Sequence, residues 1–288
     1  MEKSKVYLLK EIATDNLVKI YDAMQISLPG KIAVKLHSGE EGNQNYMKPE
    51  FVKPLIEHLQ GTVVECNTAY PGERNTTERH EALMKAHGWS RYFDVDIMDA
   101  EKPDIELSIL QGRQIKTDYV GKHIKNYTSM LVLSHFKGHP MGGYGGALKQ
   151  LSIGCASSFG KAYIHGAGYP DKAWSTEQDK FLEAMADAAW AVADYFKDKI
   201  AYINVMCNLS VDCDCCAVAE DPCMNDIGIL ASLDPVALDQ ACIDLIYQSE
   251  DSGKEHFIER VESRNGIHTI EAAAALNLGS RTYQLIQL

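Results

Sequence analysis

The sequence has no surplus of positive charge and no long apolar run. Its 288 residues carry 28 Lys and Arg against 40 Asp and Glu, so the formal net charge is −12. This balance excludes a basic nucleic-acid binder, because such proteins hold phosphates with Lys and Arg. No segment approaches the roughly 20 apolar residues that cross a bilayer, and the N-terminal residues lack the apolar stretch of a signal peptide. We therefore expect a cytoplasmic protein that binds neither nucleic acid nor membranes.

Two common nucleotide-binding motifs are also missing. The glycines in residues 154–161 are separated by five residues instead of four, and Ala162 stands where a P-loop needs Ser or Thr. Residues 143–145 begin a dinucleotide-like pattern, but Leu148 stands at its third glycine position. The sequence therefore predicts neither of these two nucleotide sites.

Short β-rich runs alternate with helical periodicity along the chain. The alternation predicts an α/β fold with a mainly parallel sheet and flanking helices. The predicted strands are 5–9, 31–37, 62–67, 93–98, 105–110, 128–135, 200–206, 227–232 and 283–286, with 93–98 and 105–110 as an edge hairpin. The predicted helices are 17–28, 49–60, 76–87, 147–153, 175–197, 235–247 and 270–276. Ser175 and Thr176 are candidate caps, and Asp234 caps a helix that Pro235 begins. Without a repeat or linker, residues 1–288 form a single compact domain or two closely packed lobes that meet near Gly121.

Ionisable side chains follow several of the predicted strands. In an open parallel sheet, ligands bind outside the carboxyl ends of the strands. The residues at these ends include Lys35, His37, Asn67, Arg74, His135, Lys137 and His139. Each residue alone fits a solvated loop. The convergence of Lys, His and Arg at one edge of a sheet predicts a site for a small anion.

A glycine-rich stretch follows the strand that ends at His135. Glycines let a backbone approach a ligand closely, and here they precede the predicted helix 147–153, whose amino end attracts anions. They are Gly142, Gly143, Gly145 and Gly146. Lys149 lies in the first turns of this helix and adds a full charge for a phosphate or carboxylate. His135 and His139 are four residues apart, but Gly138 and Pro140 favour a loop, so a metal at this pair competes with hydrogen-bonding histidines.

Four cysteines fall within eleven residues, at positions 213, 215, 216 and 223. Without a signal peptide, a disulfide framework is the weaker interpretation, and such close thiolates suit a soft metal or an iron–sulfur cluster. The spacing matches neither a ferredoxin run nor a zinc ribbon. Unligated reactive or structural thiols are the alternative.

Together these motifs resemble a prokaryotic family of unknown function, domain of unknown function 362, whose members are often labelled iron–sulfur centre proteins. The resemblance rests on residues 34–40, 65–74, 87–88, 135–149 and 226–239. It implies a shared pocket lined by Lys35, His37, Asn67, Arg74, His135, Lys137, His139, Lys149, Lys161 and His165. It also implies that Cys213 and Cys215 form the family's Cys-x-Cys element.

The chain departs from that pattern in two ways. Longer relatives add a ferredoxin-like tail, which is absent before Leu288, so an electron-transfer role that rests on such a tail is not expected here. Cys216 and Cys223 instead enrich the local cysteine set. A cluster held by the core domain itself is therefore the favoured interpretation.

The first hypothesis is an iron–sulfur protein with a cationic, glycine-rich pocket for a small anionic substrate and redox, lyase or isomerase chemistry. In this hypothesis His135 or His139 transfers a proton, and Lys149 with the glycine amides binds the anion. The predicted catalytic residues are His135, His139, Lys149 and Lys35. Arg74 clamps a carboxylate. The substrate-binding residues are His37, Asn67, Arg74, Lys137, Gly142, Gly143, Gly145, Gly146, Lys161 and His165. The metal ligands are Cys213, Cys215, Cys216 and Cys223.

Two other hypotheses stay open. One is a hydrolase or isomerase that uses no metal or carries zinc on the cysteines as a structural staple. The other is a non-enzymatic protein that stores a cluster or metal for maturation of another protein. The expected partners are a small anionic molecule, a redox partner protein and, on base rates, a second copy in a homodimer.

Overall fold

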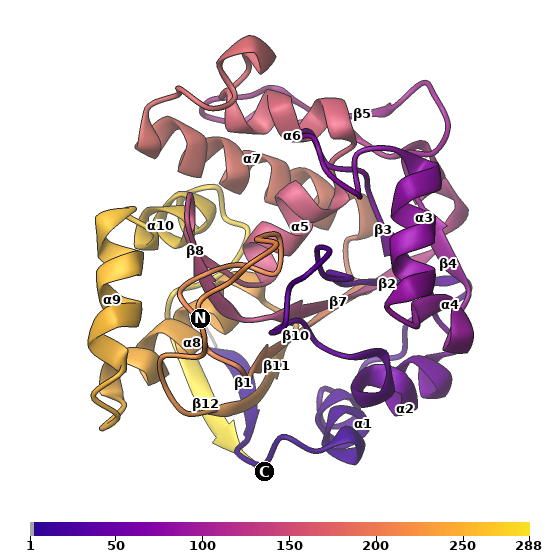
Figure 1. Cartoon of the computed structure of the whole chain (residues 1–288). Coiled ribbons are helices and arrows are strands. Elements are labelled where there is room, and N and C mark those ends of the chain that lie inside the picture. The colour runs from indigo at the N-terminus through magenta and orange to yellow at the C-terminus, as the bar shows by residue number, and fades with distance from the viewer. Residues whose placement is uncertain (1–2) are drawn as a thin grey trace.

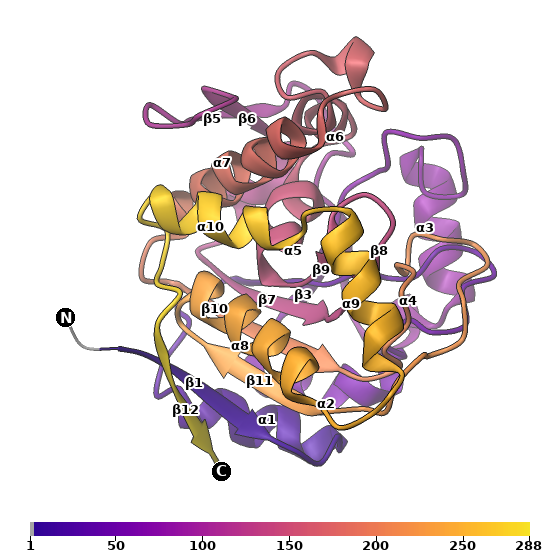
Figure 2. The ribbon, with the colours of Figure 1, turned by 90° about the vertical axis from the view of Figure 1, so that its left-hand side faces the viewer.

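Eight strands form one sheet in the computed structural model, which describes residues 3–288 (Figures 1 and 2). Seven strands run in one direction and only β11 is reversed. In spatial order they are β12 (Tyr283–Gln287), β1 (Ser4–Leu9), β11 (Gly228–Ser232), β10 (Ile200–Met206), β7 (Ser129–His135), β2 (Ile32–Lys35), β3 (Thr62–Glu65) and β4 (Val95–Ile97). The mainly parallel α/β sheet predicted from the sequence is confirmed.

Helices cover both faces of this sheet, as Figure 2 shows. One face packs against α1 (Thr14–Ala23) and α2 (Pro49–Leu59), near α3 (Thr77–Ala86) and α4 (Trp89–Tyr92). The other packs against α5 (Ala147–Cys155), α7 (Gln178–Phe196), α8 (Pro235–Gln248) and α10 (Ile267–Ala275), with α6 (Ser158–His165) and α9 (Lys254–Ser263) beside them. Burial on both faces explains the continuous apolar runs of β7 and β10. In residues 3–288, no helix is long and apolar enough to cross a membrane.

One predicted helix cap is present in the structure and the other is not. Asp234 caps α8 as expected, because its carboxylate accepts hydrogen bonds from the amides of Val236 and Ala237 at 2.9 and 3.0 Å. Ser175 and Thr176 do not cap α7, which begins at Gln178. Their hydroxyls donate instead to the Lys172 carbonyl, the end of the short 3₁₀ turn Pro170–Lys172. The helix therefore starts one residue later than a cap at Thr176 requires and two residues later than a cap at Ser175 requires.

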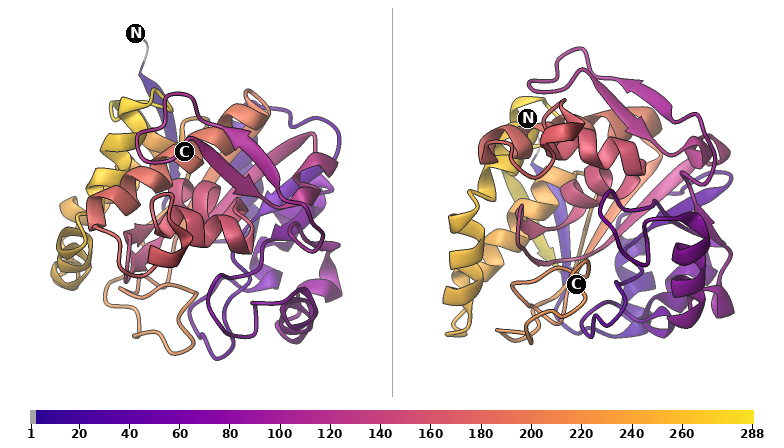
Figure 3. Two further views of the ribbon diagram at one scale, coloured as in Figure 1. Left: turned by 90° about the horizontal axis from the view of Figure 1, so that it is seen from above. Right: turned by 45° about the horizontal axis from the view of Figure 1, so that its top comes forward.

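The predicted edge hairpin is wrong. The strand predicted at 93–98 is β4, which joins the main sheet in parallel with β3. The strand predicted at 105–110 is β5 (Ile105–Ser108), which pairs antiparallel with β6 (Thr117–Val120), a strand that the sequence pattern missed. This ribbon lies against α6 and α7, away from the main sheet (Figure 3). The turn-rich residues between β4 and β5 thus connect the main sheet to the separate two-stranded sheet of β5 and β6.

Asp118 in β6 is a buried carboxyl group that the fold leaves poorly compensated. Neither oxygen has a hydrogen-bond partner of good geometry within residues 3–288, and the side chain is fully buried. Burial raises the pKa of Asp118 to about 8, although the nearby Tyr119 amide and Lys161 lower it slightly. The carboxyl is therefore neutral in the folded protein at neutral pH.

We expect Asp118→Asn to stabilise the protein increasingly as pH rises. The pKa of Asp118 is higher in the folded than in the unfolded chain. This group therefore lowers the free energy of unfolding hardly at all below about pH 4 and lowers it most above about pH 8. Urea unfolding at pH 8 should show a gain on the order of 3 kcal/mol, and at pH 4 almost none. The control is Asp187→Asn, because Asp187 is equally buried but accepts three backbone hydrogen bonds, from Arg113, Gln114 and Ile115. That control should destabilise, and equal effects of both variants would contradict the assignment.

Candidate functional site

The candidate site lies where the parallel strands β2, β3 and β7 end side by side. Lys35, Glu65 and His135 are the last residues of these strands, so their side chains reach the same edge of the sheet. A cavity of about 140 Å³ opens at this edge. Eight of the predicted site residues line it: Lys35, His37, Arg74, His139, Lys149, Lys161, His165 and Cys215. The structure therefore brings eight of the eighteen predicted site residues together at this edge of the sheet.

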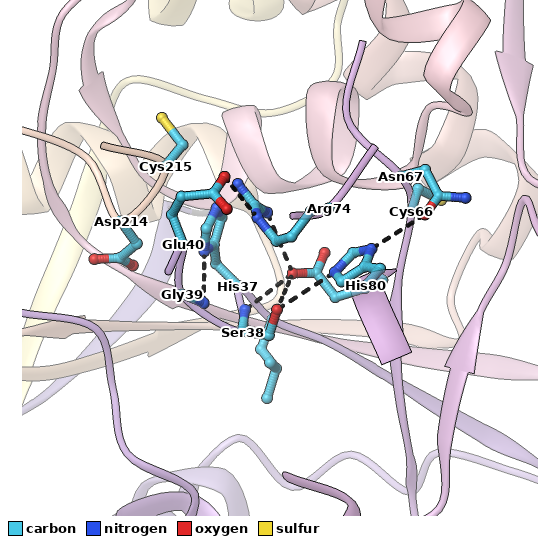
Figure 4. A network of polar contacts seen from close by, with 12 residues as sticks. His37, Ser38, Gly39, Glu40, Cys66, Asn67, Arg74, His80, Asp214 and Cys215 are labelled. Atoms are coloured by element: carbon cyan, nitrogen blue, oxygen red, sulfur yellow. Dashed lines mark hydrogen bonds and ion pairs between the residues drawn. The ribbon is translucent and has the colours of Figure 1, made fainter. Parts of the chain in front are cut away.

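The other predicted residues lie beside this cavity or farther away. His135, Lys137, Gly145 and Gly146 line a smaller adjoining hollow. Asn67 points to α3, where its amide donates to Thr77 and its oxygen meets His80 (Figure 4). The remaining members are Gly142, Gly143, Cys213, Cys216 and Cys223, which are not among the residues that line the cavity.

Two of the cavity's cations are held by carboxylates. The Lys35 ammonium is 2.7 Å from Glu65, and both side chains are almost fully buried. Arg74 donates to Glu40 at 3.1 Å, a contact drawn in Figure 4. Burial alone would raise the pKa of Glu65, but the charge of its partner Lys35 holds it well below its usual range. Lys35 and Arg74 are therefore largely neutralised before any ligand binds.

Lys149 and Lys161 give the cavity its excess of positive charge. Neither has a carboxylate within 4 Å in the part of the chain that the structure describes. Lys161 is buried and donates to the carbonyls of Ala156 and Cys66 at 2.6 and 3.4 Å, and burial lowers its pKa. Lys149 lies in the first turn of α5, 3.8 Å from the Cys213 sulfur. The cavity therefore attracts an anion, and Lys149 is the more accessible cation.

His139, Cys213 and Cys215 form a group that could hold a metal ion. Their candidate ligand atoms all lie within 4.8 Å of one another, and the His139 Nε2 to Cys215 Sγ distance is 3.9 Å. One tetrahedral ion with bonds of about 2.3 Å to sulfur and 2.0 Å to nitrogen requires separations of roughly 3.6 Å. Cys215 also lines the cavity, so an ion in this group would face it. The spacing fits a single soft ion.

Cys216 and Cys223 are placed differently. Cys216 contacts Cys215 at the half-exposed side of the loop. The Cys223 thiol donates to the Leu209 carbonyl at 3.2 Å, and Cys223 lines a separate shallow hollow with Asn225 and Asp251. The four cysteines are therefore not gathered around one point, and His139 stands in the group instead. Metal ligation by Cys216 or Cys223 stays a prediction without support from this geometry.

The Cys213 sulfur is surrounded by nitrogen donors. The Cys215 amide lies 3.5 Å from it, the Lys149 ammonium 3.8 Å, and His139 is also close. The hydrogen bond with the Cys215 side chain, followed by the charges of Lys149 and His139, holds the pKa of the Cys213 thiol well below its usual range despite burial. These contacts therefore favour the thiolate form of Cys213, the form that binds metals and acts as a nucleophile.

The ring of His139 has its proton on the side of the cysteines. Its Nδ1 accepts hydrogen bonds from the amides of Met141 and Gly142 at 3.1 and 2.9 Å. The neutral ring therefore carries its proton on Nε2, which faces the sulfurs. Metal-binding histidines usually donate from the second nitrogen, so a metal at Nε2 would have to displace this proton. The two cysteine sulfurs are consequently the stronger ligands, and Gly142 serves the site by orienting His139.

His135 is a permanent cation and does not suit the predicted role in proton transfer. Its Nδ1 lies 3.0 Å from the Asp214 carboxylate and its Nε2 lies 2.6 Å from the Cys207 carbonyl, so both nitrogens donate. Burial opposes this charge, but Asp214 raises the pKa of His135 to about 10. Lys137 donates to the same carboxylate at 2.6 Å. His135 and Lys137 therefore anchor Asp214, the residue between the two cysteines.

His165 and His37 are the histidines with proton-transfer geometry. The Nδ1 of His165 donates to the Lys161 carbonyl at 2.8 Å, which leaves the lone pair on Nε2, and burial lowers its pKa to about 3. The Nδ1 of His37 accepts from the Gly39 amide at 3.1 Å, which leaves the proton on Nε2. Burial and the charge of Arg74 hold the pKa of His37 well below its usual range. Both are neutral at pH 7, one as an acceptor and one as a donor.

The glycine-rich stretch does not form the predicted anion cradle. The amides of Ala147 and Leu148 at the amino end of α5 bind the Asp239 carboxylate at 2.8 and 3.0 Å. A Cβ at Gly146 would lie 2.5 Å from the same carboxylate. Gly143, at φ +78°, packs against Gly266. The glycines therefore admit the protein's own side chains and backbone, and a carboxylate of α8 fills the place expected for a ligand.

Sequence reasoning missed several residues that shape the site. Trp174 and Met141 contribute apolar surface to the cavity, and Tyr70 contacts both Arg74 and Glu40. Trp174 lies in the turn before α7, where no strand end or motif marks it. Gln150, which also lines the cavity, directly follows Lys149, and that neighbourhood was its only signal.

A family model described as "Domain of unknown function (DUF362)" matches residues 32–244. None of the curated proteins compared matches the sequence. A structure of the lactate racemase apoprotein from Thermoanaerobacterium thermosaccharolyticum is 14% identical over 69% of this chain and 50% of that chain, with a TM-score of 0.42. A Thermotoga maritima protein is 11% identical over 93% of this chain and 60% of that chain, with a TM-score of 0.46. The chain thus spans half to three fifths of the length of these two structures.

Proposed function

We propose, from the premise that the chain belongs to the DUF362 family, that it is an enzyme for proton transfer on a small organic anion, a lyase or isomerase. One observation carries the proposal: a single cavity combines a lysine without a carboxylate partner within residues 3–288, a neutral histidine acceptor, a neutral histidine donor and, beside them, a group that could hold a metal. These groups come from five separate segments: β2, β8, α5 and α6 with the residues beside them, and the loop between β10 and β11. Loop polarity alone gives no reason for this convergence.

Lys149 is proposed to bind the anionic group of the substrate. Lys35 and Arg74 already have carboxylate partners, and Lys161 donates to two carbonyls, whereas the Lys149 ammonium lies 3.8 Å from the Cys213 sulfur. A hydrogen bond from an ammonium to a carboxylate contributes about 1.5–3 kcal/mol. The anionic group would therefore lie close to the two cysteines.

His165 is proposed as the proton acceptor and His37 as a hydrogen-bond donor. His165 has a lone pair on Nε2 that would accept the proton of a C–H bond next to the carboxylate, and the bound anion would raise the low pKa of this ring by stabilising its charged form. The neutral His37 ring carries a proton on Nε2, with which it can donate a hydrogen bond to an oxygen of the same substrate and stabilise the charge that develops there. The proton that His165 takes is returned to the substrate by His165 or by solvent, so the reaction needs no oxidant.

The cysteine pair is proposed to hold a soft metal ion, with Cys213 and Cys215 as its main ligands. The observed separations favour one ion over the iron–sulfur cluster expected from the sequence, and the position beside the cavity favours a catalytic over a purely structural metal. An ion there would act as a Lewis acid on an oxygen of the bound anion. Iron–sulfur chemistry stays the competing proposal, because Cys216 lies next to Cys215.

The proposed chemistry predicts hydrogen exchange on the substrate. Purified protein in D₂O should introduce deuterium at the carbon next to the carboxylate of at least one short acid, tested on a set that includes acids with a neighbouring hydroxyl or carbonyl group. Proton NMR measures the loss of signal. His165→Gln should slow this exchange at least 100-fold, because general base catalysis contributes about 10²–10⁴.

The control for the exchange experiment is Tyr169→Ala. Tyr169 is exposed, lies in sequence between His165 and Trp174, and is not among the residues that line the cavity, so exchange should continue at the rate of the unaltered protein. Exchange that persists in His165→Gln would remove His165 as the base. No exchange on any acid, with metal bound and the protein folded, would overturn the proposed reaction class.

A further inference from the structure

We propose, as a consequence of the proposed function, that the substrate is an amphipathic monocarboxylate whose apolar tail lies against Met141, Ile153 and Trp174. These three side chains come from the turn between β8 (Lys137–His139) and β9 (Gly143–Gly145), from α5, and from the segment before α7. All three line the same cavity as Lys149. The cavity therefore has a charged end and an apolar wall.

Trp174 is the clearest sign of an apolar ligand. Its side chain is 57% exposed although it lines the cavity, and its ring rests on His165 at a centroid distance of 5.1 Å. Indole rings are amphipathic and commonly present a flat apolar face to a partner. A ligand that covers this face removes apolar surface from water, which favours binding by about 25 cal/mol per Å². A fully polar substrate would leave this surface without a partner.

The helix α5 sets the length of the tail. Lys149 and Ile153 are four residues apart and both line the cavity, so they lie on one side of the helix. Four residues rise by about 6 Å along a helix, a length that corresponds to roughly four carbon–carbon bonds. The cavity volume of about 140 Å³ is close to that of a cavity of roughly 150 Å³ that holds benzene. Both measures favour an acid of about four to six carbons.

The wall also argues against a second carboxylate at the far end of the ligand. Met141, Ile153 and Trp174 offer no charge to such a group. Besides Lys149, Lys161 is the cavity-lining cation without a carboxylate partner within residues 3–288, and its ammonium already donates to two carbonyls. A dicarboxylate would have to exchange water for these apolar surfaces. We therefore expect butyrate to bind more tightly than succinate.

A homologous series of acids tests the proposal. The protein contains three tryptophans, so ¹⁵N-tryptophan labelling gives three indole signals, and Trp174→Phe identifies the one from Trp174. Titrations with acetate, propionate, butyrate, pentanoate and hexanoate should shift this signal. The affinity should rise about fourfold per methylene, which corresponds to 0.8 kcal/mol each, and should level off near pentanoate.

Two variants separate this inference from the proposed function. Isothermal titration calorimetry measures these variants, because Trp174→Ala lacks the indole signal. Trp174→Ala should weaken pentanoate binding about tenfold and leave acetate binding almost unchanged, whereas Lys149→Gln should weaken every acid by about the same factor. Tyr169→Ala is the control and should leave the series unaltered. Binding that depends on Lys149 but is equal for all acids, or that prefers succinate, would overturn the apolar tail alone. Binding of all acids that ignores Lys149 would overturn the anion site on which the inference rests.

Discussion

Replacing Cys213 and Cys215 together by serine is expected to abolish metal binding. Protein purified without oxygen should contain about one zinc or iron ion per chain, and the double variant should contain none above background. The reason is chemical: the hydrogen bond with Cys215 and the nearby positive charges lower the pKa of the Cys213 thiol, whereas a serine hydroxyl stays neutral and is a poor ligand for a soft ion. Elemental analysis of iron and zinc, together with acid-labile sulfide and a visible spectrum, measures the result.

Cys223→Ser is the matched control for that experiment. It removes a thiol from the same cysteine-rich segment, but one that bonds to the Leu209 carbonyl, so the metal content should not change. His139→Gln should lower the metal content only in part, because the His139 Nε2 carries a proton in the neutral ring. Iron with an equal amount of sulfide and a brown colour would replace the single ion by an iron–sulfur cluster. A double variant that keeps its metal would exclude this pair as the ligands.

The location of the site can be predicted from the sequence because parallel strands all end at the same edge of the sheet. Lys35 and Glu65 end neighbouring strands that run in the same direction, so their side chains meet at one edge. Alternating strand and helix patterns are enough to predict this direction. The pattern does not say which residues pair there. The ion pair of Lys35 with Glu65 removes a predicted catalytic lysine from the set of groups that are ready to act.

The glycine-rich stretch shows why a helix end is an incomplete signal. The amide groups of Ala147 and Leu148 attract any nearby anion, and the anion that reaches them is Asp239, about ninety residues away in sequence. Local sequence contains no record of such a distant contact. The same limit applies to the histidines, since the proton positions of His135 and His139 depend on carbonyl, carboxylate and amide partners brought by other segments.

The cysteines show how close spacing in sequence can mislead. Cys223 lies at the base of its loop, where an isolated β-bridge joins Leu209 and Met224. The backbone N–H of Cys223 also donates a hydrogen bond to the Leu209 carbonyl at 2.9 Å. Cys213 and Cys215 lie farther along that loop, where Asp214 is fixed by His135 and Lys137. The backbone thus separates thiols that are only eight to ten residues apart. A histidine from a different segment completes the group instead.

Glu65→Gln is expected to destabilise the protein by about 3–5 kcal/mol at pH 7, the cost of leaving a buried partner charge unpaired. The substitution keeps the shape of the side chain but leaves the fully buried Lys35 ammonium without its carboxylate. It also weakens the acceptor for the Ser38 amide, which donates to Glu65 at 2.9 Å. Urea unfolding followed by circular dichroism measures the change. The matched control is Glu57→Gln, because the Lys53–Glu57 pair has the same 2.7 Å separation but is about half exposed.

That control should cost no more than about 0.5 kcal/mol, because exposed helix pairs contribute little. The pH dependence gives a second, independent signature. The pKa of Glu65 is lower in the folded than in the unfolded chain, so its stabilisation is complete above the unfolded value of about 4.3 and is lost as the pH falls through and below it. Unaltered protein should therefore lose stability below about pH 4.5 more steeply than Glu65→Gln does. Glu65→Gln and Glu57→Gln could instead lose the same unfolding free energy, or Glu65→Gln and the unaltered protein could show the same pH dependence of stability. Either result would mean that water reaches Lys35 and that the Lys35–Glu65 ion pair is not shielded from solvent.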